Sequence, residues 1–319
     1  MSNPEYYQLF GVREYKPNYA LHIFLFIITF FTVTLAGVQW VLKDPFELSN
    51  LNYGLPYSIS ILFIIASHEF GHYFAAKKHG VTTTLPFFIP FPPIPFVLNF
   101  GTLGAVIRIK SLIPNRKALF DIGVAGPIAG FIATLLVLIY GFENLPDIEY
   151  LYQIHPEYRF LPSLPKGDLT FGDTLLFFFF RKIFSLLNPD AFIPPMNEIY
   201  HYPYLCAGWF GLLVTAMNLI PIGQLDGGHI IFAMFGDRHK YIARGFFYSL
   251  LFFGLFGIFE QNLGWPGWLV WAFILYFIIK IEHPPIGTFG MLDKKRKIIG
   301  WIAILIFFLS ISPVPVTIK

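Results

Sequence analysis

The stretch HEFGH, residues 68–72, carries two imidazoles and one carboxylate in the spacing H-E-x-x-H. On a helix, His68 and His72 lie one turn apart on the same face, with their Cβ atoms about 5–6 Å apart. That separation lets both rings bind one Zn²⁺ at about 2.0–2.1 Å. Glu69 can accept a proton from an attacking water without occupying the metal. The pattern predicts a metal-dependent hydrolytic site; a polar cluster that binds no metal is the alternative.

A catalytic zinc needs a third protein ligand and one open position. The segment NLIPIGQLDGG, residues 218–228, offers Asp226, a carboxylate within a long hydrophobic stretch. Pro221 and Gly223 interrupt a helix just before it, which can turn the carboxylate toward the interior of a helix bundle. Asn218 lies two turns earlier and is a candidate for contact with a substrate backbone or a developing oxyanion.

The elements that hold these residues are predicted to lie in a membrane. The chain has 319 residues, of which 55% are hydrophobic and 13% charged, whereas soluble domains carry about 25% charged residues. The net charge of +3 is too small to indicate a nucleic-acid partner. A single cysteine excludes an internal disulfide framework. We therefore expect an all-α polytopic membrane protein, surrounded by a lipid bilayer and without a nucleic-acid partner.

Seven hydrophobic stretches approach the length of about 20 residues that a membrane-spanning helix needs. They are residues 21–42, 55–78, 118–140, 205–235, 245–260, 265–281 and 297–312. We expect one integral membrane domain over 1–319, with a catalytic core at 55–240 and C-terminal helices at 241–319.

Lysine and arginine clusters predict the orientation. With alternating spans, the clusters at 77–78, 108–117, 238–244 and 294–297 all fall on the side of the N-terminus. The positive-inside rule places that side in the cytoplasm. The first twenty residues show neither a signal-peptide nor a transit-peptide pattern, so we expect the plasma (inner) membrane of a prokaryote.

The loop at 81–117 combines a Pro- and Phe-rich run with the segment NFGTLGAVIRIKS. The alternation of that segment predicts a strand, and Gly101 and Gly104 favour a β-hairpin or close backbone approach. The loop is too apolar for a solvated linker, so we expect it to re-enter the membrane near the active site. The strand can pair with an extended substrate, with a purely structural hairpin as the alternative. Asn99, Gly101 and Gly104 are thus candidates for substrate contact.

The outer loop at 141–204 contains LLFFFFRKIFSLL, for which we predict an amphipathic surface helix. Asp121 is expected to pair with Lys117 on its own helix. His229 is expected to support the metal site without binding the metal. The remaining histidines lack metal-ligand spacing and are expected to be structural; they are His22, His79, His155, His201, His239 and His283.

Two paired motifs resemble those of the site-2 protease family. HEFGH in one span is matched by N-x-x-P-x-x-x-L-D-G at 218–227 in another, and AGPIAG at 125–130 is similar to the family's third helix pattern. The stretches 101–130 and 209–236 are most similar to the branch that contains EGY-type proteins and prokaryotic relatives lacking PDZ and CBS domains. The resemblance covers roughly 55–240, and the two motifs are specific only as a pair.

This resemblance implies an intramembrane zinc endopeptidase that cuts a transmembrane segment of a membrane-protein substrate. It implies that one Zn²⁺ is held by His68, His72 and Asp226. Glu69 would be the general base.

Other functions can use intramembrane histidines and a carboxylate. A metal-ion transporter or channel predicts polar residues along more than the two spans that carry them here. An inactive relative would bind membrane proteins without cutting them, against which the intact Glu69 argues. A metalloprotease of the prenyl-protein type would carry a later Glu in place of the L-D-G motif. The sequence does not indicate an oligomeric state.

Overall fold

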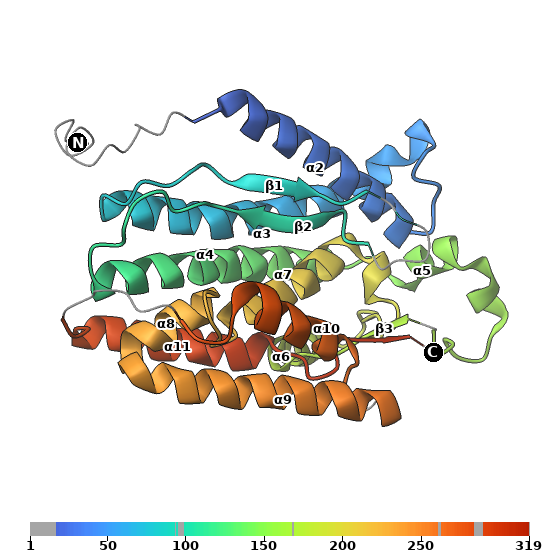
Figure 1. Ribbon diagram of the computed structural model, residues 1–319. Coiled ribbons are helices and arrows are strands. Elements are labelled where there is room, and N and C mark those ends of the chain that lie inside the picture. Colours follow the sequence, from blue (N-terminus) through green and yellow to red (C-terminus); the bar gives the residue numbers. More distant parts are fainter. Residues whose placement is uncertain are drawn as a thin grey trace.

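Helices form most of the computed structural model, which describes residues 17–92, 94, 99–167, 169–260, 263–283 and 290–318 (Figure 1). Part of the Pro- and Phe-rich run, at 93 and 95–96, lies outside the described residues. The α-helices are α2 (Tyr19–Trp40), α3 (Leu51–Lys78), α4 (Arg116–Glu143), α5 (Ile148–Ile154), α6 (Leu175–Leu187), α7 (Pro203–Leu219), α8 (Asp226–Phe235), α9 (His239–Phe259), α10 (Gly267–Ile274) and α11 (Lys294–Ser310). The strands are β1 (Phe87–Pro90), β2 (Thr102–Val106), β3 (Leu169–Phe171) and β4 (Val316–Ile318).

Within the described ranges, four helical runs are long and apolar enough to cross a membrane. By length and composition they are Tyr19–Trp40, Leu48–Lys78, Arg116–Glu143 and Asp226–Phe259, the last of which contains α8, a 3₁₀ turn and α9. Two further apolar helices, Pro203–Leu219 and Gly267–Ile279, are shorter. The prediction of a mostly helical membrane protein with several spans is confirmed, whereas the predicted count of seven spans is not.

Large apolar side chains cover the outer faces of these helices. Phe24, Ile27 and Phe31 of α2 are exposed, as are Phe252 and Phe256 of α9. Soluble monomers rarely leave contiguous apolar patches of this kind uncovered. The outward faces of α2 and α9 therefore suit contact with lipid chains.

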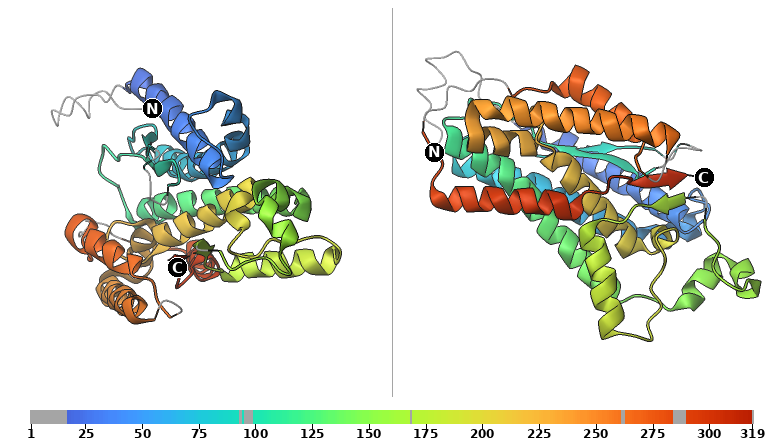
Figure 2. Two further views of the ribbon diagram at one scale, coloured as in Figure 1. Left: turned by 90° about the vertical axis from the view of Figure 1, so that its right-hand side faces the viewer. Right: turned by 90° about the horizontal axis from the view of Figure 1, so that it is seen from below.

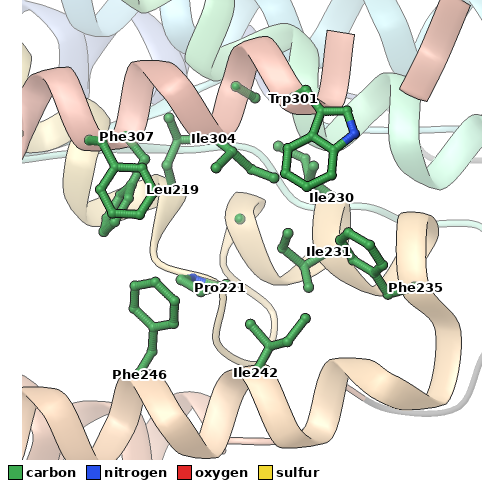
Figure 3. Close-up of a pocket in the computed structure, with 13 residues that line it drawn as sticks. Leu219, Pro221, Ile230, Ile231, Phe235, Ile242, Phe246, Trp301, Ile304 and Phe307 are labelled. Atoms are coloured by element: carbon green, nitrogen blue, oxygen red, sulfur yellow. The ribbon is translucent and has the colours of Figure 1, made fainter. Parts of the chain in front are cut away.

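The predicted fourth span at 205–235 is divided into two helices. α7 ends at Leu219, and α8 begins at Asp226 after a turn in which Gly223 adopts φ 56°. Pro221 lacks the N–H that would continue the hydrogen bonding of α7, and the positive φ of Gly223 turns the chain. At the other end of α8, Gly236 has φ 59° and the chain reverses into α9 (Figure 3). The span predicted at 245–260 therefore begins earlier, because this three-residue turn suffices as the connection.

The predicted hairpin is present in the loop between α3 and α4. β1 pairs with β2 antiparallel, with Phe87 opposite Val106 and Phe88 opposite Ala105. β1 packs along α2, and β2 contacts α3. A second two-stranded sheet joins β3 of the outer loop to β4 at the C-terminal end. The sequence analysis did not anticipate this second sheet, because each of its strands is only three residues long.

The outer loop packs onto the end of the helical body opposite the basic helix ends. Lys77 and Lys78 end α3, Arg116 begins α4, and Lys294 begins α11; these helix ends lie at one end of the body (Figure 1). α6 occupies the residues for which a surface helix was predicted, and it projects from the body in Figure 2. The assignment of the basic end to the cytoplasm stays a prediction.

The expected ion pair between Asp121 and Lys117 is not the one that forms. The Asp121 carboxylate accepts hydrogen bonds from Arg296 Nε at 2.8 Å and Nη2 at 2.6 Å. His79 Nε2 lies 2.8 Å from the same carboxylate. The planar guanidinium matches both carboxylate oxygens, which a lysine ammonium on the same helix cannot do. Asp121 thereby joins α4 to the start of α11.

Candidate metal centre

α3 presents two imidazoles and a carboxylate to the interior of the bundle. His68, Glu69 and His72 are 6%, 7% and 7% exposed, respectively. Because the two histidines are four residues apart on an unbroken helix, their rings lie on the same face. His68 Nε2 and His72 Nε2 are 3.0 Å apart. The predicted juxtaposition of the two rings is therefore present.

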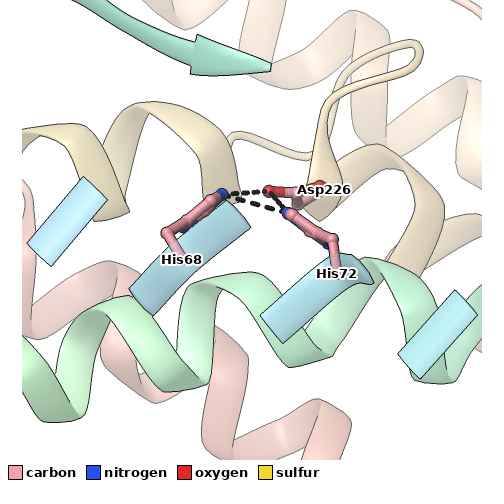
Figure 4. Close-up of side chains that lie close together, drawn as sticks. All are labelled: His68, His72 and Asp226. Carbon is pink, nitrogen blue, oxygen red and sulfur yellow. Dashed lines mark hydrogen bonds and ion pairs between the residues drawn. The ribbon is translucent and has the colours of Figure 1, made fainter. Parts of the chain in front are cut away.

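Asp226 completes a cluster of three side chains (Figure 4). Its Oδ2 lies 3.3 Å from His68 Nε2 and 3.2 Å from His72 Nε2. One ligand atom from each residue falls within 4.8 Å of the other two. The break between α7 and α8 places Asp226 in the first turn of α8. Two segments about 150 residues apart in sequence thus meet at one point, as the sequence analysis expected.

Glycines of α4 make the close packing around the histidines possible. A Cβ atom added at Gly126 would overlap the ring of His72, and one at Gly130 would lie 3.1 Å from His68 Cβ. On the facing helix, a Cβ at Gly71 would lie 2.6 Å from the Ala125 carbonyl oxygen. The G-x-x-x-G pair therefore lets α4 lie directly against the imidazoles, as close helix packing requires.

A backbone carbonyl orients the His72 ring. His72 Nδ1 lies 2.7 Å from the Ile122 oxygen. A carbonyl oxygen only accepts hydrogen bonds, so the proton is assigned to Nδ1 and the lone pair to Nε2. An N–H that donates to a backbone carbonyl in this way is the usual partner of a metal-binding histidine. The ring thus presents its basic nitrogen toward Asp226.

An open cavity gives access to the cluster. The lining includes Glu69, Asn218 and the segment 105–107, which is formed by the last two residues of β2 and the residue after it. The Ile107 backbone lies within hydrogen-bonding reach of the Glu69 carboxylate. Asn218 Nδ2 is 3.5 Å from His68 Nε2. The Glu69 carboxylate, the Asn218 amide and the end of β2 therefore surround the cavity beside the two histidines.

The remaining predicted contact residues, Asn99, Gly101 and Gly104, are not among the residues that line this cavity. The Asn99 side chain is buried, donates to Pro92 O at 3.1 Å and accepts from Gly101 N at 2.7 Å. A Cβ at Gly101 would overlap Val33 of α2, and Gly104 has φ 97° with open space around it. Asn99 and Gly101 thus shape the turn against α2. Their role in substrate contact, like that of Gly104, stays a prediction.

Sequence reasoning missed the hairpin end and a histidine pair beside the site. Ala105, Val106 and Ile107 line the cavity, whereas the prediction centred on the glycines before them. His229 also lines the cavity, and its Nδ1 is 2.7 Å from His283 Nε2. His283 lies 54 residues further along the chain, so no local spacing could have indicated the pair. The alternation of the strand was the one signal that pointed to the hairpin residues.

A separate cavity lies between α8, α9 and α11 (Figure 3). Its lining contains no carboxylate, imidazole or amide side chain, and the indole of Trp301 is its one polar group. Ile230, Ile231 and Phe307 are representative of the rest. This cavity offers no group for acid–base or metal chemistry, so the candidate site is the cluster on α3 and α8.

Comparison with known proteins decides the family. Residues 56–258 match the sequence model of the protein family described as Peptidase family M50. The chain belongs to this family. The matched region contains HEFGH, AGPIAG and the L-D-G motif. The resemblance to the site-2 proteases that the paired motifs indicate is thereby confirmed.

Plant proteins are among the curated relatives of this member of peptidase family M50. The chain is 29% identical over 289 residues to "Probable zinc metalloprotease EGY2, chloroplastic" of Oryza sativa subsp. indica, covering 89% of this chain and 48% of that protein. It is 30% identical over 271 residues to "Probable zinc metalloprotease EGY1, chloroplastic" of Arabidopsis thaliana, covering 82% and 43%. The predicted similarity to EGY-type proteins is confirmed.

The chain spans about half the length of the curated relatives it matches. Those relatives are named as chloroplastic, so the expected prokaryotic plasma membrane is not supported. That expectation came from the first twenty residues alone. No solved structure matches the chain.

Proposed function

We propose that this chain is an intramembrane zinc metalloendopeptidase that cuts a transmembrane segment of a membrane-protein substrate. The observation that carries the proposal is the convergence of His68, His72 and Asp226 beside Glu69. Membership of peptidase family M50 and the zinc metalloprotease names of the relatives support it. The apolar outer faces of the helices support a site enclosed by lipid.

The three side chains fit a zinc ion. In a tetrahedral site with bonds of about 2.0–2.1 Å, neighbouring ligand atoms lie about 3.3 Å apart. The three separations here are 3.0, 3.2 and 3.3 Å. Two neutral imidazoles and one carboxylate form a donor set that leaves one position open, as catalytic zinc sites do. His68, His72 and Asp226 would therefore hold one Zn²⁺.

Glu69 carries the proton chemistry in this proposal. Zn²⁺ when bound supplies a Lewis acid that polarises the substrate carbonyl and makes water more acidic. Glu69 takes the proton of the attacking water and returns it to the leaving amine. The Glu69 carboxylate is buried beside the Ile107 backbone, and low-dielectric surroundings strengthen polar contacts. The Asn218 amide donates to the oxygen on which negative charge develops.

The hairpin provides a place for an unwound substrate. A peptide bond within a helix is shielded, so the substrate must extend before attack. In the described part of the chain β2 pairs only with β1, so its other edge has no partner strand. Main-chain pairing with that edge orders an extended segment without strong side-chain selectivity. Because the last residues of β2, Ala105 and Val106, line the cavity together with Ile107, the paired segment is led toward Glu69.

The depth of the site fits a cut within the membrane. His68 lies nine residues before Lys77 on the unbroken helix α3. At 1.5 Å per residue, this distance is about 14 Å along the helix axis. The open cavity provides a route for water to that depth. We therefore expect cleavage inside the hydrophobic segment, on the half nearer the basic helix ends.

Replacement of Glu69 tests the proposal. Membrane fractions from cells that express the native chain should contain fragments that end within hydrophobic segments, and those from cells with Glu69→Gln should lack them. The purified Glu69→Gln protein should retain its zinc content, because the ligands are unchanged. Glu143→Gln, at the exposed end of α4, is the matched control and should cleave normally. Equal fragment patterns from native and Glu69→Gln proteins would remove Glu69 from the mechanism.

A further inference from the structure

The outer loop assembles a second group of potential metal ligands. His155, Glu198 and His201, here called the outer-loop trio, each offer one ligand atom within 4.8 Å of the other two. His155 lies between α5 and the 3₁₀ turn Pro156–Phe160, and the other two lie just before α7. Glu198 and His201 are fully buried. More than forty residues separate His155 from the other two, which is why no sequence spacing indicated the group.

The two imidazoles of the trio turn the same nitrogen toward each other. His155 Nε2 and His201 Nε2 are 3.1 Å apart. His155 Nδ1 lies 3.0 Å from Glu157 Oε1, and His201 Nδ1 lies 2.6 Å from the Trp40 carbonyl oxygen. Both of these partners are acceptors, so each Nδ1 carries a proton. In neutral rings the two Nε2 atoms then face each other as lone pairs.

Glu198 adds a third lone pair to the same point. Its Oε2 lies 3.6 Å from His201 Nε2. This oxygen is buried and has no hydrogen-bond partner among the described residues. The other oxygen, Oε1, accepts from Asn197 Nδ2 at 2.8 Å and from the Tyr158 hydroxyl at 3.4 Å. A buried carboxylate oxygen without a donor is costly unless a cation lies against it.

We propose that the outer-loop trio binds a divalent transition-metal ion of the Zn²⁺ class. Three lone pairs that converge on one point are stabilised by a cation between them, and two imidazoles with one carboxylate suit zinc. The Nδ1 contacts to Glu157 and to the Trp40 carbonyl orient both rings, as outer partners of metal-binding histidines do. The His155 side chain is 16% exposed, so the trio is accessible to water, which can serve as a fourth ligand.

The position of the trio indicates a structural role. Through His201 it reaches the end of α2 at Trp40, and His201 precedes α7, which carries Asn218. Tyr150 of α5 donates its hydroxyl to the His201 carbonyl oxygen at 2.7 Å. An ion at this point would join the outer loop to two helices of the membrane body. The site lies outside the candidate metal centre and does not depend on the proposed proteolytic activity.

Zinc binding by the 319-residue protein in detergent tests the proposal. His68→Ala combined with His72→Ala removes the candidate catalytic site and defines the background protein. After equilibration with Zn²⁺ alone and removal of excess, this background should retain about one zinc per chain. Adding His155→Ala or Glu198→Gln should weaken zinc binding by more than about 10-fold. Replacing a residue that only hydrogen-bonds to a metal ligand already causes a loss of about this size, and these residues would be ligands themselves. Glu198→Gln preserves side-chain volume, so it decides the matter if His155→Ala fails to fold.

His79→Ala in the same background is the matched control. The His79 side chain is 19% exposed and contacts the carboxylate of Asp121, so it resembles His155 in exposure and partner. Zinc retained by this control and lost with His155→Ala or Glu198→Gln would support the site. A background protein that holds no zinc, or one that keeps its zinc with Glu198→Gln, would overturn it. In that case the two rings share a proton as a hydrogen-bonded pair.

Discussion

Gly126→Ala tests whether helix packing sets the position of a metal ligand. The added Cβ would lie more than about 1 Å inside the optimal separation of about 3.5–4.0 Å from atoms of the His72 ring. The Ile122 carbonyl fixes that ring, so relief requires α4 to retreat or the ring to leave its position. Overpacking of this kind costs about 1–3 kcal/mol. If that cost falls on the bound state, zinc affinity decreases about 5- to 150-fold.

Alanine substitutions at two other glycines should lower zinc affinity less than Gly126→Ala does. Gly130→Ala places its Cβ 3.1 Å from His68 Cβ, a milder overlap with a smaller expected loss. Gly245→Ala, in α9, meets no atom within 4 Å and is the matched control. Alanine is about 0.8–1.0 kcal/mol more favourable than glycine within a helix, so this control should be neutral or stabilising.

The assay is competition for Zn²⁺ between purified protein and a fluorescent chelator, together with thermal unfolding of the same samples. Affinity should follow the order Gly245→Ala, then Gly130→Ala, then Gly126→Ala, from unchanged to weakest. A zinc affinity and a melting temperature equal to those of the native protein in Gly126→Ala would refute the reasoning. The packing of α4 at Gly126 would then not constrain the His72 ring.

Three further substitutions address other contacts. Asp226→Asn preserves shape but removes the charge, so zinc affinity measured by chelator competition should decrease at least about 10-fold; an unchanged affinity would exclude Asp226 as a ligand. Asp121→Ala breaks the bidentate contact with Arg296, which is about a quarter exposed, and should lower the free energy of unfolding by about 1 kcal/mol in a denaturant titration; an unchanged value would show that the pair adds nothing. Burial raises the pKa of Tyr150 to about 12, so its hydroxyl stays protonated and donates to His201 O. Tyr150→Phe should therefore cost about 0.5–1.5 kcal/mol of stability, and a variant as stable as the native protein would remove this contact from the account.

The sequence predicted the features that depend on local periodicity. The pair His68 and His72 could be placed on one helix face because a helix advances by a fixed angle per residue. Pro221 and Gly223 marked the break before Asp226, because each has a backbone property that acts within a turn. The alternation around Gly101 indicated the hairpin for the same reason.

Features that depend on distant contacts could not be predicted in this way. β3 and β4 pair across about 145 residues, and each strand is too short to show a period. Asp121 was assigned to a nearby lysine, although Arg296 reaches it from 175 residues away. The trio of His155, Glu198 and His201 needs the folded outer loop before its nitrogens face one another.

The position of bound zinc tests the central claim most directly. Anomalous diffraction at the zinc edge, from crystals of the 319-residue protein, locates the ion independently of sequence similarity. The account predicts a peak at about 2.0–2.2 Å from His68 Nε2, His72 Nε2 and an oxygen of Asp226. A zinc-loaded crystal with no peak between these three atoms, or with a peak that only one of them approaches, would contradict it.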